Sequence, residues 1–118
     1  MRTPLLFALL GLTFGFATVS NATCEYPAEV KVPPGASATK AEIEAAATTV
    51  KKYLADLDDY MKCIDAEFAA VPVEEQTDEV KAMHVKRYNA AVDAMNAAAT
   101  SFNTELRAFK AANPQTAK

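Results

Sequence analysis

The feature that most constrains this chain is a run of apolar side chains over residues 43–68 that recur at alternating steps of four and three. This spacing is typical of a helix face that packs lengthwise on another helix. The members of this apolar seam are Ile43, Ala47, Val50, Leu54, Leu57, Met61, Ile64 and Phe68. We predict a helix over residues 39–70, opened by a capping box of Thr39 and Glu42 and ended before Pro72.

A second helix is predicted over residues 78–112, because Asn113 and Pro114 end the pattern and leave residues 113–118 as a tail. The sequence offers two possible starts for this helix, at Pro72 or at Thr77, and does not decide between them. Its apolar face comprises Val80, His84, Tyr88, Ala91, Met95, Ala98, Phe102, Leu106 and Phe109. Two long helices joined by the short connection 71–77 must lie antiparallel, so the fold class is all-α, a coiled-coil-like two-helix hairpin.

A hairpin leaves part of each apolar stripe open to solvent. The β-branched side chains of the seam fall mainly at heptad position d, which disfavours a simple parallel dimer. We therefore expect an extended segment of the same chain, or a second copy, to cover the open stripes.

Residues 1–22 are interpreted as a signal peptide. Arg2 precedes an apolar run over residues 5–19, and Ser20 and Ala22 supply small residues before the cleavage point. The alternative, a membrane anchor, requires about 20 apolar residues. The sequence thus predicts a periplasmic or secreted protein without stable membrane insertion after cleavage.

The charge balance argues against nucleic acid as a partner. The chain carries 12 basic and 15 acidic side chains, and loss of Arg2 with the signal makes the mature chain more acidic. Binding to phosphates requires a basic surface.

Cys24 and Cys63 are the chain's two cysteines, and an exported chain with an even cysteine count usually pairs them. The alternative is that the cysteines form an intermolecular disulfide and that the N-terminal segment is flexible. Residues 23–38 read as an extended arm, because Pro27, Pro33 and Pro34 cannot lie inside a helix.

The arm is long enough to reach Cys63. Cys63 lies about 36 Å along the helix from Thr39, and the 15 steps from Cys24 to Thr39 span roughly 46 Å in a polyproline conformation. We expect the arm to fold back along the first helix, bringing Tyr26 against Tyr53 and Tyr60.

A set of residues spread over most of the chain beyond residue 22 forms one pattern. Its members are Cys24, Tyr26, Pro27, Val32, Pro33, Gly35, Thr39, Val50, Tyr53, Tyr60, Cys63, Glu67, Tyr88, Asn89, Asp93, Phe102, Asn103, Arg107 and Lys110. The pattern resembles a group of short exported proteobacterial proteins. The resemblance implies export and the helical fold, and no catalytic residues, since the group has no assigned activity.

The candidate metal ligands are His84, Met61, Met83 and Met95, a soft donor set that would suit copper in an exported protein. The competing interpretation is a packed, hydrogen-bonded histidine among methionines that fill gaps in a helical core. We favour the second interpretation and expect no cofactor.

Nothing in the sequence indicates an enzyme. Ser37 and Ser101 are the serines outside the signal, and neither lies in a nucleophile-elbow context. Gly35 is the one glycine beyond residue 22, so a glycine-rich phosphate loop is absent.

A polar stripe on the second helix is the least ordinary surface. Its members repeat at steps of four and three, where a solvated face would carry more Lys and Glu. They are Asn89, Asp93, Asn96, Thr100, Asn103 and Arg107. The stripe is either a plain solvated flank or a surface that hydrogen-bonds the arm, a partner or a second copy.

These observations predict an exported, non-enzymatic binding or structural module of the cell envelope that meets a protein partner or self-associates. Two alternatives are a periplasmic copper-handling protein and an extracytoplasmic chaperone-like helper.

Overall fold

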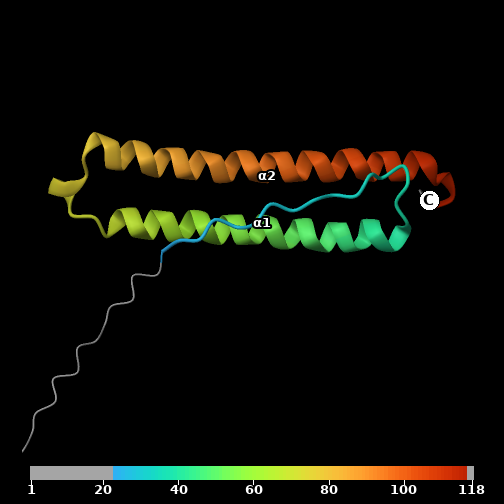
Figure 1. Cartoon of the computed structure of the whole chain (residues 1–118), viewed down its shortest axis with the longest axis horizontal. Helices are drawn as coiled ribbons and strands as arrows, with labels where there is room; N and C mark the ends of the chain where they lie inside the picture. The colour runs from blue at the N-terminus through green and yellow to red at the C-terminus, as the bar shows by residue number, and fades with distance from the viewer. Residues whose placement is uncertain (1–22, 117–118) are drawn as a thin grey trace, which may run out of the picture.

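The computed structural model describes residues 23–116, so the predicted signal peptide and the last two residues lie outside the described part. Two helices, α1 (Lys40–Ala69) and α2 (Asp78–Ala112), lie side by side and antiparallel (Figure 1). Two short 3₁₀ turns follow them, η1 (Val73–Glu75) and η2 (Pro114–Thr116). Residues 23–116 contain no strand, and the predicted all-α hairpin is confirmed.

The helix ends follow from local side-chain chemistry. The Thr39 backbone N–H donates to Glu42 Oε2 at 2.7 Å, and the Glu42 N–H donates to Thr39 Oγ1 at 3.2 Å, so the capping box is formed. The first of these hydrogen bonds lowers the pKa of the Glu42 carboxyl. At α2, Thr77 Oγ1 accepts from the Val80 N–H at 3.3 Å. Of the two candidate starts, the helix therefore takes Thr77, while Pro72 precedes η1.

The core lies along the predicted seam of α1. Leu57 and Ile64 are 0% and 1% exposed, and Ile43, Val50 and Met61 are also buried. On α2 the buried residues are Ala91 and Phe109, while Val92, Ala94, Met95 and Ala98 pack partly buried against the core. The alanines of α2 leave room for a third element to approach the helix pair.

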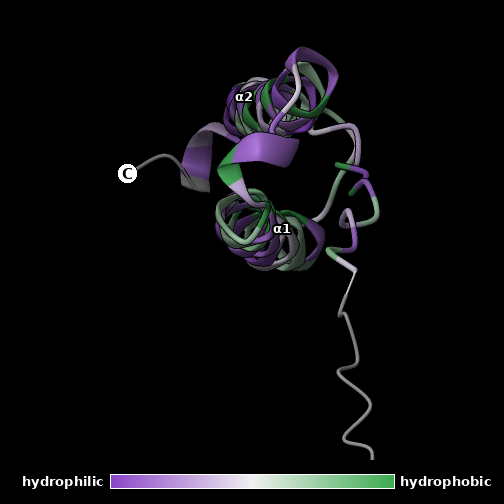
Figure 2. Cartoon of the chain, turned by 90° about the vertical axis from the view of Figure 1, so that its left-hand side faces the viewer, coloured by the Kyte–Doolittle hydropathy of each residue, from purple (hydrophilic) through white to green (hydrophobic). Residues whose placement is uncertain are grey.

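The arm is that third element. Residues 23–38 run back along the hairpin, antiparallel to α1, on one side of both helices (Figures 1 and 2). Cys24 and Cys63 form a disulfide at its start, with Cα atoms 5.8 Å apart. Closing a loop of 39 residues by a disulfide stabilises a fold by about 4 kcal/mol in the chain-entropy model. The predicted pairing and the folded-back course of the arm are confirmed.

The arm contacts α2 as well as α1, which the sequence did not predict. The Tyr26 hydroxyl donates to the Ala90 carbonyl of α2 at 3.4 Å. Near the other end of the arm, the buried Gly35 donates its N–H to Glu105 Oε2 at 2.6 Å. A Cβ at Gly35 would lie 1.7 Å from the Glu105 carbonyl oxygen, so a larger residue there cannot approach α2.

We expect Gly35→Ala to destabilise the oxidised protein by about 2 kcal/mol or more, because the methyl group overlaps α2 backbone. Urea unfolding followed by circular dichroism measures the change. Ala36→Ser, at the exposed neighbouring position, is the matched control and should change stability by less than about 0.5 kcal/mol. Equal stability of Gly35→Ala and wild type would contradict the placement of the arm on α2.

Candidate functional site

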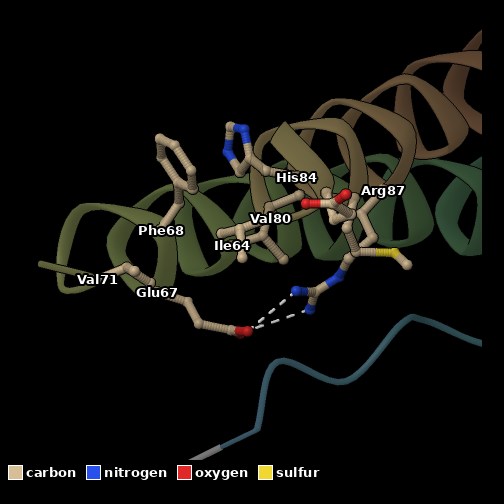
Figure 3. A pocket seen from close by; sticks show the side chains of 9 residues that line it. Ile64, Glu67, Phe68, Val71, Val80, His84 and Arg87 are labelled. Carbon is tan, nitrogen blue, oxygen red and sulfur yellow. Dashed lines mark hydrogen bonds and ion pairs between the residues drawn. The ribbon is translucent and has the colours of Figure 1, made fainter. Parts of the chain in front are cut away.

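A cavity of about 270 Å³ opens at the connected end of the hairpin (Figure 3). The last turns of α1 and the first turns of α2 line it. Its walls are largely apolar, and charged side chains stand at its rim. The lining residues are Ile64, Glu67, Phe68, Val71, Glu79, Val80, Met83, His84 and Arg87.

His84 lies at the edge of the helix interface, with 22% of its side chain exposed. Its Nε2 is 2.8 Å from Asp65 Oδ1 on α1, and its ring stacks on Phe68 with centroids 4.5 Å apart. Tyr88 flanks the ring at 6.3 Å. The imidazole is thus hydrogen-bonded and stacked between the two helices.

The methionines named with His84 do not gather around it. Met83 lines the cavity and is 55% exposed, whereas Met61 is buried in the core. Met95 packs partly buried against that core and, like Met61, does not line the cavity. Within residues 23–116, no cluster of three or more His, Cys, Asp and Glu side chains is placed to hold a metal ion.

Arg87 joins the two helices on the other side of the cavity, where Figure 3 draws its bonds to Glu67. Its Nη1 donates to Glu67 Oε1 at 3.0 Å, and its Nε donates to the Tyr60 hydroxyl at 3.2 Å. Its guanidinium also lies 5.7 Å from the centroid of the Tyr60 ring. The hydrogen bond to Glu67, followed by that to Tyr60, raises the pKa of Arg87.

Sequence reasoning missed Arg87. The sequence did contain an indication of this contact, because Tyr60 and Glu67 lie on the same side of α1 and an arginine lies on the helix that follows the connection. The relative rotation of the two helices decides whether these groups meet.

Tyr26 of the arm forms a cluster with two tyrosines of α1, Tyr53 and Tyr60. The rings of Tyr26 and Tyr60 meet edge to face with centroids 5.1 Å apart, which confirms part of the expected contact. Tyr53 and Tyr60 are buried, while Tyr26 remains 44% exposed. Burial, and then the neighbouring Tyr53, raises the pKa of the Tyr26 hydroxyl. Val30 and Val32 border the same groove as Tyr53, together with Ala94 and Ala98 of α2.

The polar stripe does not hold the arm. Asn89, Asp93, Asn96, Asn103 and Arg107 are all exposed, and Arg107 Nε donates to the Asn103 carbonyl of the same helix at 3.2 Å. Within residues 23–116, no hydrogen bond links the stripe to the arm, which runs along the alanine-rich edge of α2 instead.

The side of the hairpin opposite the arm forms an open face. Along the middle of the helices no described segment covers it (Figure 2). Counted at 100° per residue, the side chains of the open face lie on one side of the line along which the two helices touch. Tyr53 and Tyr60 on α1, and Ala90 and Ala94 on α2, lie on the other side of that line, beside the arm. Tyr88 is 36% exposed and the others are half-buried. The open face comprises Ala47, Leu54, Tyr88, Val92, Met95, Ala99, Phe102 and Leu106.

These features define a disulfide-linked helical hairpin with one covered and one open face. Comparison with protein-family models, with curated proteins and with solved structures gives no match to the chain. Within residues 23–116, neither helix has the length and apolar character needed to cross a bilayer.

Replacing Arg87 by methionine should cost about 1–2 kcal/mol of folding stability, since it removes three interhelical hydrogen bonds, one to Tyr60 and two to Glu67, and leaves Glu67 without its partner. Chemical denaturation measures the loss. Lys86→Met, at the exposed neighbour, should fall within about 0.5 kcal/mol of wild type. Two variants of equal stability would show that Arg87 does not join the helices.

Tyr26 should ionise at higher pH than a free tyrosine, because burial disfavours its phenolate. Because the folded-state pKa of Tyr26 is raised, its neutral hydroxyl contributes folding stability that is fully present below the unfolded-state pKa. This contribution is lost as the pH rises through the folded-state pKa. An ultraviolet absorbance titration should show a late tyrosine component. That component should vanish in Tyr26→Phe and in the Cys24→Ser, Cys63→Ser double variant. Its persistence in Tyr26→Phe would assign it elsewhere.

Proposed function

We propose that this chain is a non-enzymatic binding or structural module of the cell envelope, exported by residues 1–22, which meets its partner through the open face. The observation that carries this proposal is the asymmetry of the hairpin. The arm covers one apolar side, while the open face leaves side chains such as Leu54, Val92 and Phe102 half-exposed. Contiguous apolar surface of this kind marks interaction sites.

The chemistry of the rest of the chain agrees with this class. A disulfide that holds the arm suits an oxidising compartment such as the periplasm. Two side chains that line the end cavity, His84 and Arg87, contact acidic groups of α1, Asp65 and Glu67 respectively, which favours a stabilising role for them. The net charge of −3 favours a protein partner over nucleic acid, because binding to phosphates requires a basic surface.

Site-specific photocrosslinking in the native envelope tests the proposal. A photoreactive residue at Val92 reports on the open face, and the same residue at the adjacent Asp93 reports on the polar stripe. We expect protein adducts, with this chain or another, from Val92 and none from Asp93. Adducts from Asp93 alone, or from neither position, would contradict the proposal.

A further inference from the structure

We propose that a second copy of this chain covers the open face, with α1 antiparallel to α1 and α2 antiparallel to α2, in a four-helix bundle that carries the arms outside. This inference rests on the proposed function, and it names the partner. A two-fold dimer uses the same patch on both copies, so the patch must be complementary to itself. Both helices meet this requirement.

On α1 the charges beside the open face are ordered. At 100° per residue, six charged side chains lie within about 80° of the direction of Leu54. Lys40 and Lys51 stand toward one end, and Asp58 and Asp65 toward the other. Glu44 and Lys62 complete the set, and within one chain they already pair with Lys40 and Asp58.

An antiparallel α1 pair centred close to Leu54 brings opposite charges together. Lys51 comes level with Asp58 of the second copy, and Lys40 with Asp65 of the second copy, each within about one helical turn. Glu44 meets Lys62 of the second copy in the same way. The pairs within each helix then join into interhelical networks, and charge complementarity of this kind fixes register.

On α2 the apolar side chains of the open face are symmetric about Ala97. Tyr88 and Leu106 each stand nine residues from it, Val92 and Phe102 five, and Met95 and Ala99 two. An antiparallel α2 pair centred there sets each side chain against the other member of its pair. Met95, for example, would pack on the small Ala99 of the second copy, which suits interdigitated packing.

The two centres lie at one level of the hairpin, as a single two-fold axis requires. Asp65 of α1 contacts His84 of α2, so positions equally far from this pair along the two helices lie at the same level. Counting eleven residues away from the connection gives Leu54 on α1 and Met95 on α2. Phe68 also contacts His84, and fourteen residues along lie Leu54 and Ala98. Ala97 lies between these two positions on α2.

The other face-to-face arrangement sets α1 beside α2 of the second copy. The same counting brings Lys40 level with Lys110 of the second copy. Like charges at that position oppose this arrangement. The first arrangement also brings Lys81 within about one turn of Lys110 of the second copy, so it is the opposite-charge pairs along α1 that favour the first one.

Charge reversal at Lys51, which is exposed, and at Asp58, which is half-buried, tests this geometry while sparing the core. We expect sedimentation to detect a dimer whose dissociation constant rises about five- to tenfold in Lys51→Asp and in Asp58→Lys, and returns toward wild type in the double variant. Lys52→Asp, about 160° from Leu54, is the control and should leave the dissociation constant unchanged. No rescue in the double variant would contradict the pairing.

A photoreactive residue at Leu54 then distinguishes the two arrangements. Mapping of the crosslinked dimer should place the adduct in α1 of the second copy, and an adduct in α2 would overturn the proposal. A monomer at every concentration would overturn it as well. In that case, envelope adducts from Val92 to a different protein would leave the proposed function standing, whereas their absence would remove both.

Discussion

The structure depends on how a two-helix hairpin covers its apolar side chains. Two helices touch along one line, and on either side of that line each apolar stripe stays open. On one side the arm lies over Tyr53 and Tyr60, and the Cys24–Cys63 disulfide holds its start there. The disulfide matters because an extended segment with few hydrogen bonds would otherwise lose little by detaching.

The polar contacts stabilise the hairpin at its two ends. Near the connection, Arg87 and His84 cross the interface on opposite sides of the cavity, to Glu67 and Asp65 respectively. At the far end, the Gly35 N–H meets Glu105 and ties the turn of the arm to α2. These contacts fix the rotation and level of one helix against the other, and so decide which side chains form the open face.

Much of the fold could be predicted because its causes are local. The four-three seam and the Thr39 capping box each depend on residues within a few positions of one another. The disulfide needed only the cysteine count and the reach of the arm. The contacts of the arm with α2 could not be predicted in this way, because Tyr26 and Ala90 are 64 residues apart and Gly35 and Glu105 are 70 apart. The alanines of α2 resembled generic helix formers, while their role is to let the arm approach. The same reason explains Arg87, whose partners depend on helix rotation.

The arm acts as a third packing element across both helices. Nuclear Overhauser spectra of the oxidised protein test it most directly. We expect cross-peaks from Tyr26 and Val30 to Tyr53 and Tyr60 on α1, and also to Ala90, Ala94 and Ala98 on α2. Cross-peaks to α1 alone, or to neither helix, would contradict it.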